Sequence, residues 1–337
     1  MTSLHAHHQP SPPAEATASP DTLAAFNKAA GDALRLSILR VLRRASYSVM
    51  ELCQILDVRQ PALSHHLKVL AQANLVTSRR EGNTLFYRRA NGQRSDGLEL
   101  LQQQLFRTVD TLLLDAGCEP RIRAVQQERS ASSREFFREN AHDFREQQER
   151  MASLDQYIDT LTDMLDSLAF PNTEHAIEVG PGEGHFLPAL AKRFTAVTAV
   201  DNSPQMLARS EALARANRLA NVQCRHGEPD SLDAHITSCV VINMVLHHVA
   251  APGELLADCA ALLAPGGCLL VAELCPHEQE WAREACGDIW LGIEPDDLLS
   301  WAEDAGLIEG QSVYLALRNG FRMQIRPFHQ PNQPVRH

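Results

Sequence analysis

The sequence predicts an α/β protein made of two unlike parts: a small α+β part near the amino end and a larger part with a mostly parallel sheet between helices. Its 337 residues are too many for one ordinary domain and suit two. Charge divides the chain in the same way. Residues 21–95 hold 12 Lys and Arg against 5 Asp and Glu, a net charge of +7. Because the whole chain has a net charge of −11, the other residues together carry −18. Beyond residue 170, apolar runs alternate with helical patterns, which is typical of a parallel sheet buried on both faces.

Both ends of the chain are predicted to be disordered, as an arm over residues 1–21 and a tail over residues 329–337. We interpret His5, His7 and His8 as part of a solvated arm. The start lacks the basic and apolar regions of a secretory signal, and no apolar run approaches the roughly 18 residues of a membrane span. The 8 cysteines form no C-x-x-C pair and are expected to be reduced thiols. We therefore expect a cytoplasmic protein.

Three helical patterns and one turn fill the basic part. "DTLAAFNKAAGDALRLSILRVLRRA" has apolar residues such as Leu34 and Ile38 at helical spacing and predicts one amphipathic helix. "SVMELCQIL" predicts a short helix with Ser48 and Glu51 as a capping box, and "QPALSHHLKVLAQANL" predicts a longer one. "LVTSRREGNTLFYRRA" alternates around residues 81–83, as a β-hairpin does. Three helices followed by a basic hairpin predict a winged helix-turn-helix.

In this arrangement the second helix of the turn enters the major groove of DNA, and its polar outer face reads base edges. Arginines on the hairpin would lie at phosphates or in a minor groove. The alternative is a winged helix that contacts only protein, with solvated arginines. The predicted DNA-binding residues are Arg59, Gln60, Ser64, His65 and Lys68 on the helix and Arg79, Arg80 and Arg88 on the hairpin.

Residues 22–95 resemble the ArsR family of bacterial repressors, through "SHHLKVL" followed by "LV…RREGN…Y". The resemblance implies a homodimer, paired through its first and last helices, that binds an inverted-repeat operator in double-stranded DNA. Residues 96–133 are expected to supply dimerisation and linker helices, because "GLELLQQQLFRTVDTLLLDA" carries an apolar stripe. That stripe consists of Leu98, Leu101, Leu105, Leu112 and Leu113.

Many members of that family sense metals, and the residues here argue against it. The familiar site reads E-L-C-x-C, whereas "ELCQIL" keeps Cys53 but has Ile55 in place of the second thiolate. A second family site needs His and Asp on the last helix, yet no histidine lies between His66 and His142. One thiolate does not hold Zn²⁺ or As(III), which take three or four ligands. We therefore expect no metal site.

The acidic part is predicted to begin with helices over residues 134–170 and to continue as strands that alternate with helices. The five buried strands are "HAIEVG", "AVTAVD", "VQCRHG", "SCVVINMVL" and "GGCLLVAEL". "SVYLALR" and "FRMQIRPF" follow, and the Asn319-Gly320 pair between them predicts a closing antiparallel hairpin.

A glycine-rich turn, "EVGPGEG", lies between the first of these strands and a helix. Its G-x-G-x-G spacing departs from the G-x-G-x-x-G of dinucleotide folds. Glu178 and Glu183 would repel a pyrophosphate but attract a ligand that carries an ammonium and a sulfonium. Asp201 ends the second strand, where an acid accepts ribose hydroxyls; the alternative is that it caps the next helix. These residues predict S-adenosylmethionine or its demethylated product, S-adenosylhomocysteine, as the ligand.

Residues 134–328 resemble the class I S-adenosylmethionine-dependent methyltransferases, through "EVGPGEG", "VDNSPQML", "HGEPDSL", "VINMVLHHV" and "LAPGGCLLVAEL". The resemblance implies a Rossmann-like fold with a mostly parallel seven-stranded sheet and helices on both faces. It assigns the glycines to the methionine part, Asp201 to the ribose, and a carboxylate at Glu228, where the family more often has Asp, to the adenine amino group. The cofactor residues it implies are Glu178, Gly180, Gly182, Gly184, Asp201, Asn202, Met206, Glu228 and Asn243.

The catalytic residues are less directly indicated. His247 and His248 follow the fourth strand, where acceptors approach in this fold, so one of them is a candidate base; the alternative is that both pack or cap. Glu273 and His277 are further candidates at the rim. "CPHEQEWAREACGDIWLGIEPDDL" could form a substrate lid, and "REFFRENAHDF" is expected to lie over the cofactor mouth.

Three functions fit these patterns. The first is a DNA-binding regulator whose second half senses an S-adenosyl compound. The second is a working methyltransferase, with a small-molecule or protein substrate, that also regulates its own operon. The third is a metal(loid)-responsive repressor with a vestigial second half, which the cysteine pattern disfavours.

Overall fold

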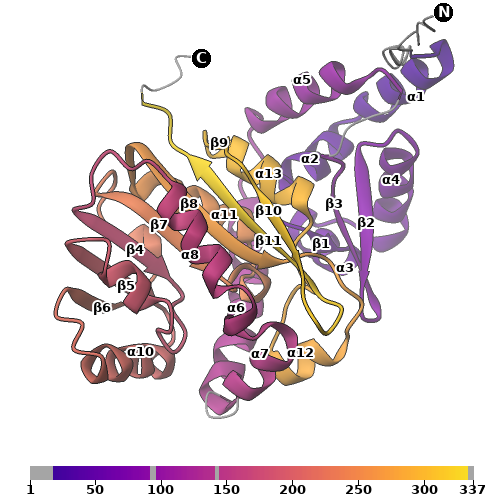
Figure 1. Ribbon diagram of the computed structural model, residues 1–337. Coiled ribbons are helices and arrows are strands. Elements are labelled where there is room, and N and C mark those ends of the chain that lie inside the picture. The colour runs from indigo at the N-terminus through magenta and orange to yellow at the C-terminus, as the bar shows by residue number, and fades with distance from the viewer. Residues whose placement is uncertain (1–17, 92–95, 141–143, 333–337) are drawn as a thin grey trace, which may run out of the picture.

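The computed structural model describes residues 18–91, 96–140 and 144–332, and Figure 1 shows two parts, each with its own sheet. Most of the two terminal segments predicted to be disordered lies outside these residues. Helix α1 (Pro20–Ala30) begins within the first of them. No helix in the described ranges is long and apolar enough to span a bilayer.

The amino-terminal part begins with two helices, so the prediction of one continuous first helix is wrong. Helix α1 is capped at its carboxyl end by Gly31. A second helix, α2 (Ala33–Val41), starts at once, because the Asp32 side chain caps it by accepting a hydrogen bond from the Arg35 backbone N–H. The Arg35 guanidinium is buried and donates to the carbonyls of Ala29 and Lys28, each at 2.7 Å. This arginine fixes the corner between the two helices.

The helix-turn-helix follows β1 (Tyr47–Ser48) and consists of α3 (Val49–Leu56) and α4 (Gln60–Gln72). The predicted capping box is confirmed, with Ser48 and Glu51 each accepting from the other's backbone N–H. Strands β2 (Val76–Glu81) and β3 (Thr84–Arg89) form the predicted hairpin, and Gly82 takes a φ of 60° at its tip. These strands and β1 make a three-stranded sheet in the order β1-β3-β2.

Helices connect the two sheets. They are α5 (Glu99–Asp110), α6 (Cys118–Asn140), α7 (Phe144–Ala152), the 3-10 turn η1 (Leu154–Gln156) and α8 (Ile158–Ser167). The predicted leucine stripe divides, because Leu98 is buried and Leu105 packs against the core of its own chain. Leu101 and Leu112 are 40% exposed and Leu113 is 98% exposed. Of the predicted stripe, these three outer leucines remain available for pairing with a second chain.

The carboxy-terminal sheet follows the order β10-β11-β8-β7-β4-β5-β6, seven strands as expected, with the short β9 paired to β11 in addition. The strands β4 to β8 are parallel, and β11 runs antiparallel to both β8 and β10. Their bounds are β4 (His175–Val179), β5 (Ala196–Asp201), β6 (Val222–His226), β7 (Thr237–Asn243), β8 (Leu263–Leu274), β9 (Ile308–Glu309), β10 (Val313–Ala316) and β11 (Arg322–His329).

Helices cover both faces of this sheet. Leu161 of α8 and Leu190 of α9 (Leu187–Ala191) belong to the core on one face, and Leu256 of α11 and Leu298 of α13 belong to the core on the other. The remaining elements are α10 (Pro204–Ala216), η2 (Pro229–Ser231), η3 (Leu246–His248), α11 (Pro252–Leu262), α12 (Trp281–Cys286) and α13 (Pro295–Asp304). Burial on both faces explains why β4, β5, β7 and β8 read as apolar runs. The prediction of a buried strand is wrong for β6, which lies at the edge of the sheet and leaves Gln223, Arg225 and His226 exposed.

Candidate functional site

A glycine turn joins β4 to α9 at the carboxyl edge of the sheet. Gly180, Gly182 and Gly184 all have positive φ, at 64°, 59° and 83°. A Cβ on Gly180 would collide with the Val245 side chain, which approaches from the end of the next strand. The turn therefore needs glycine both for its backbone conformation and for this close approach.

A cavity of about 1110 Å³ opens beside this turn, and it gathers the predicted cofactor residues from four strand ends. Typical ligand pockets hold about 300–1000 Å³. Gly184 is the exception among the predicted residues, because its Cα faces Leu187 and Ser210 and it serves helix packing instead. The predicted residues that line the cavity are Glu178, Gly180, Gly182, Asp201, Asn202, Met206, Glu228 and Asn243.

Asp201 lies at the end of β5 with its side chain in the cavity wall, 9% exposed. Its Oδ1 accepts a hydrogen bond of 2.7 Å from the Ser203 N–H, while the Ser203 hydroxyl caps α10. The cap of that helix is therefore Ser203, and Asp201 keeps acceptor capacity for a ligand. Burial raises the pKa of Asp201 to about 6, against the opposing effect of backbone N–H donors.

Glu178 and Asn243 lie on neighbouring strands at the same edge. Glu178 is buried, which raises its pKa to about 8, and within the described residues its Oε2 has no hydrogen-bond partner. Asn243 accepts a 3.2 Å hydrogen bond from the Tyr157 hydroxyl, and Tyr157 also lines the cavity. Sequence reasoning missed Tyr157, since it comes from the helical stretch before the first strand and no motif marks it. Where β5 and β6 end, the Asn202 amide donates to Glu228 at 3.1 Å.

The two candidate catalytic histidines face different surroundings. His248 lines the cavity, whereas the side chain of His247 is fully buried behind it and its Nδ1 lies 2.7 Å from Glu273 Oε1. Burial lowers the pKa of His247, but the carboxylates of Glu273 and Asp288 raise it more, to about 9. Burial and the charge of His247 keep the pKa of His248 well below its ordinary value. His248 can contact a molecule in the cavity; His247 and Glu273 cannot.

Residues 275–298, the segment predicted to form a substrate lid, do not lie over the cavity. In the described chain no residue between His277 and Asp297 lines the cavity. His277 instead stacks edge-on against Phe321, with ring centroids 4.7 Å apart. Trp281 of the same segment packs edge-on against Phe321 as well, whereas Trp290 packs against Phe86 of the amino-terminal hairpin.

That contact engages two arginines predicted to bind DNA. Arg79 donates to the carbonyls of Leu291 and Gly292, at 2.6 and 3.2 Å, and Arg88 pairs with Asp297 of α13. The Arg88 and Asp297 side chains are 18% and 6% exposed. The structure thus uses these two arginines to join its parts, so the expectation that they face DNA needs correction.

Glu81 and Phe86 add to the same contact. Glu81 is ion-paired with both Arg79 and Arg283 of α12, and Phe86 packs edge-on against Trp290 at 5.2 Å. Beside them the backbones of the two parts are in direct contact, because the Gly253 N–H donates to the Arg44 carbonyl at 3.2 Å. A Cβ on Gly253 would lie only 2.7 Å from that oxygen.

The helix α6 touches both the cavity and the helix-turn-helix. Its residues Arg134 and Phe137, from the segment expected over the cofactor mouth, line the cavity. One turn earlier, Arg129 makes two hydrogen bonds to Glu51 at 2.7 and 2.8 Å and a third, of 3.2 Å, to the Ala250 carbonyl. Glu51 completes the capping box at the start of α3, and Ala250 belongs to the cavity wall.

The predicted DNA-reading face of α4 is exposed, as is one flank of the hairpin. Leu63, Leu67 and Leu70 point into the core with at most 1% exposure, which turns the polar residues outward. The exposed predicted residues are Arg59, Gln60, Ser64, His65, Lys68 and Arg80. Two further arginines of this part, Arg43 and Arg89, are paired internally, since both contact Asp110.

Comparison with known families agrees with this division. Residues 32–78 match the family model "Bacterial regulatory protein, arsR family", and residues 177–269 match the model "Methyltransferase domain". The ubiquinone biosynthesis O-methyltransferase of Coxiella burnetii is 30% identical over 148 residues, which cover 40% of this chain and 63% of that one. The biofilm growth-associated repressor of Agrobacterium fabrum is 42% identical over 67 residues, which cover 20% of this chain and 57% of that one.

Each of these matches spans less than two thirds of the relative's own length. Among solved structures, a geranyl diphosphate C-methyltransferase from Streptomyces coelicolor resembles the chain with a TM-score of 0.45 at 15% identity, over 55% of this chain and 83% of that one. An S-adenosylmethionine-dependent methyltransferase from Mesorhizobium loti resembles it with a TM-score of 0.44 at 14% identity, over 52% of this chain and 98% of that one.

Proposed function

We propose that this chain, in which an ArsR-family helix-turn-helix is joined to a methyltransferase domain, is a transcriptional regulator whose affinity for operator DNA depends on an S-adenosyl ligand. We assign DNA binding to residues 22–95, dimerisation and linkage to residues 96–133, and ligand binding to residues 134–328. The observation that carries the proposal is α6, which lines the cavity and is bonded through Arg129 to the helix-turn-helix.

The cavity suits S-adenosylmethionine or S-adenosylhomocysteine. Asp201 and Glu228 give its wall an acidic character, which favours a ligand with an ammonium and, in the methylated form, a sulfonium. Glu178, whose raised pKa keeps it mostly protonated in the unliganded protein, would ionise more readily beside such a cation. Asp201 is placed to accept both ribose hydroxyls, since its Oδ1 is held by Ser203 and the carboxylate faces the cavity. In the proposed pose the ligand's methionine part lies along the Gly180–Gly182 turn.

The DNA-binding surface in this proposal is the exposed face of α4 together with Arg80. Arg79 and Arg88 are not part of it, because they hold the hairpin against the methyltransferase domain. Two copies would pair through the exposed leucines after and on α5, Leu101, Leu112 and Leu113. Operator DNA as the partner implies action in the cytoplasm.

Coupling requires that the ligand bind the DNA-competent and DNA-free forms unequally, because equal affinity shifts no equilibrium. A ligand that closes Arg134 and Phe137 onto the cavity would move α6, and with it Arg129 and the start of α3. In a dimer this changes the spacing of two α4 helices that read a palindrome about one DNA turn apart.

The test is a DNA titration with an operator selected from random duplexes, at zero and at saturating S-adenosylmethionine or S-adenosylhomocysteine. We expect the ligand to change DNA affinity, and DNA to change ligand affinity by the same factor. The Asp201→Ala chain should bind DNA as the unliganded protein does at the ligand concentration that saturates the wild type. Identical DNA curves for the wild-type chain with and without either ligand would refute the regulatory function.

A second function, methyl transfer to a small molecule, is favoured by the size of the cavity, which exceeds the usual volume for one ligand. The relative in Coxiella burnetii is named as an O-methyltransferase, so small phenols are the first acceptors to try. His248 is the base candidate, since it reaches the cavity and its low pKa keeps it neutral. Acceptor-dependent formation of S-adenosylhomocysteine that is lost in His248→Ala would support this function; no turnover with any acceptor would oppose it.

A further inference from the structure

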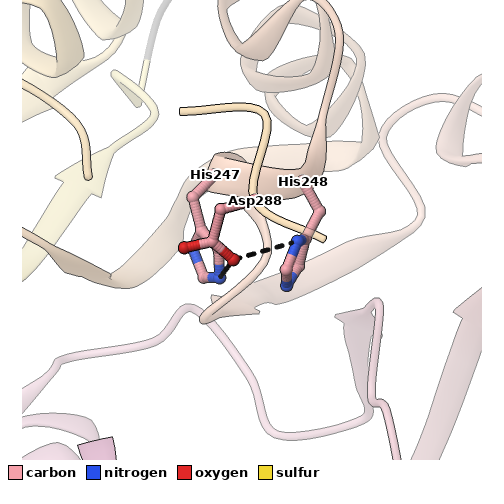
Figure 2. A group of neighbouring side chains, drawn as sticks. All are labelled: His247, His248 and Asp288. Carbon is pink, nitrogen blue, oxygen red and sulfur yellow. Dashed lines mark ion pairs between the residues drawn. The ribbon is translucent and has the colours of Figure 1, made fainter. Parts of the chain in front are cut away.

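Three side chains at the wall of the cavity converge on one point. His247 and His248 come from η3, after β7, and Asp288 comes from the turn that follows α12; Figure 2 shows the two rings and the carboxylate facing one another. One ligand-type atom from each lies within 4.8 Å of the others. The His247 and Asp288 side chains are 0% exposed and that of His248 is 8% exposed.

Glu273 fixes the orientation of the first histidine. The 2.7 Å contact between Glu273 Oε1 and His247 Nδ1 leaves Nε2 directed at Asp288, 3.9 Å from its Oδ1. The His247 backbone is also held, since its carbonyl accepts from the Ile289 and Trp290 N–H groups at 2.9 and 3.0 Å. A carboxylate on one ring nitrogen and a metal on the other is the usual arrangement of a ligating histidine.

Asp288 is the unexplained member of the group. It is 4% exposed, yet neither carboxylate oxygen has a hydrogen-bond partner in the described chain, and neither does His247 Nε2. Buried polar atoms of this kind are normally satisfied, because leaving them unpaired costs about 1–3 kcal/mol each. The distances from Asp288 Oδ1 to His248 Nδ1, 3.7 Å, and to His247 Nε2, 3.9 Å, are too long for hydrogen bonds.

The same distances fit a shared ion. Two ligands that each lie about 2.0–2.1 Å from one Zn²⁺ in a tetrahedral site are about 3.4 Å apart. The two Asp288–histidine distances would need to shorten by only about 0.3–0.5 Å to reach that spacing. A divalent ion would also offset the two buried carboxylates, Glu273 and Asp288, at the same time.

We propose that His247, His248 and Asp288 bind a divalent transition-metal ion of the zinc class, with Glu273 as a positioning residue for His247. Two imidazole nitrogens and one carboxylate oxygen suit zinc, iron(II), cobalt or nickel, whereas magnesium and calcium prefer oxygen ligands alone. Because His248 also lines the cavity, the ion lies at the cavity wall. The site is unrelated to Cys53 and to the metal sites of ArsR repressors considered above, and it does not depend on the proposed regulation by an S-adenosyl ligand.

The experiment uses the full chain, stripped of metal by a chelator and titrated with Zn²⁺ against a chromophoric competitor. We expect one tightly bound ion per chain, and with Co²⁺ a visible absorption spectrum of four-coordinate nitrogen and oxygen ligation. Asp288→Asn and His248→Gln should weaken Zn²⁺ binding by more than about 100-fold, and Glu273→Gln, which disturbs only the orientation of His247, by about 10–100-fold. His329→Gln, a partly buried histidine at the end of β11, is the matched control and should leave the affinity unchanged.

A control must show that the bound ion is not held by the amino-terminal histidines. A chain with His5, His7 and His8 all exchanged to alanine should keep its tightly bound ion. Asp288→Asn is the deciding variant, since it preserves side-chain size, and circular dichroism verifies its fold. Retained stoichiometric binding in a folded Asp288→Asn chain, loss of binding in the triple-alanine chain, or no tight binding by the wild type would each overturn the proposal.

Discussion

Replacing Asp201 by Asn should weaken ligand binding while stabilising the unliganded fold. Asparagine keeps an oxygen that can accept from the Ser203 N–H, so local structure should persist. It removes two charge-assisted hydrogen bonds to ribose, worth about 1.5–3 kcal/mol each, so affinity for S-adenosyl compounds should fall by at least about 100-fold. Burial raises the pKa of Asp201 from 3.8 to about 6. At neutral pH the buried, ionised carboxylate therefore destabilises the unliganded fold by at most roughly 3 kcal/mol, and asparagine removes this cost.

The substitution is expected to weaken ligand binding but to stabilise the unliganded fold, and this combination distinguishes a ligand-binding residue from a structural one. A purely structural aspartate would lose stability on substitution, whereas a buried acceptor awaiting a ligand gains it. Calorimetry gives the affinities for S-adenosylmethionine and S-adenosylhomocysteine, and thermal unfolding without ligand gives the stability. A folded Asp201→Asn chain that binds both compounds as tightly as the wild type, or that is less stable at pH 7.5, would refute the reasoning.

The pH dependence provides a further check on the same residue. Because the folded pKa of Asp201 lies above its unfolded value, its contribution to wild-type stability is fully present below about pH 4 and is lost as the pH rises through about 6. The stability advantage of Asp201→Asn should therefore be largest above pH 7 and disappear towards pH 4. An advantage that does not change over this range would contradict the assignment of the pKa shift.

Three further outcomes follow from the DNA-binding and pairing surfaces. Ser64→Ala should weaken binding to the selected operator by about 1–3 kcal/mol without weakening non-specific binding, in a gel-shift comparison of the two DNAs. Arg80→Ala should reduce the slope of log affinity against log salt by about 1, whereas Arg79→Ala should leave that slope unchanged because Arg79 is bonded to carbonyls of the other domain. A double exchange of Leu101 and Leu112 to Glu should give monomers by light scattering, since both leucines are 40% exposed on the predicted pairing face; a persistent dimer would place the interface elsewhere.

The elements with strong local signals were predictable. The capping box at Ser48 and Glu51, the hairpin around Gly82 and the strand series from β4 to β8 all agree with the structure, because caps, turns and buried parallel strands leave their pattern in adjacent residues. The cavity residues were found for the same reason. In parallel sheets the strand ends meet at one edge, so Glu178, Asp201 and Asn243 come together although they are distant in sequence.

What the sequence did not reveal depends on tertiary contact. Arg79 and Arg88 carry the same charge as Arg80, and no local pattern distinguishes an arginine that pairs with Asp297 from one that faces solvent. The break at Gly31 was missed because a single glycine within an apolar periodicity is often tolerated inside a helix. Leu98 and Leu105 lie on the predicted stripe, but only the packed structure shows that the core of their own chain covers them.

The contact between the hairpin and the methyltransferase domain bears on how such a protein can evolve. Gly253 approaches the Arg44 carbonyl too closely for any side chain, and Glu81 is ion-paired with Arg283 across the same boundary. An excised amino-terminal part would expose Phe86 and leave Glu81 without that partner. The two halves should consequently melt in one calorimetric transition, and neither half can be exchanged as an independent cassette with a homologue unless the matching surface is transferred with it.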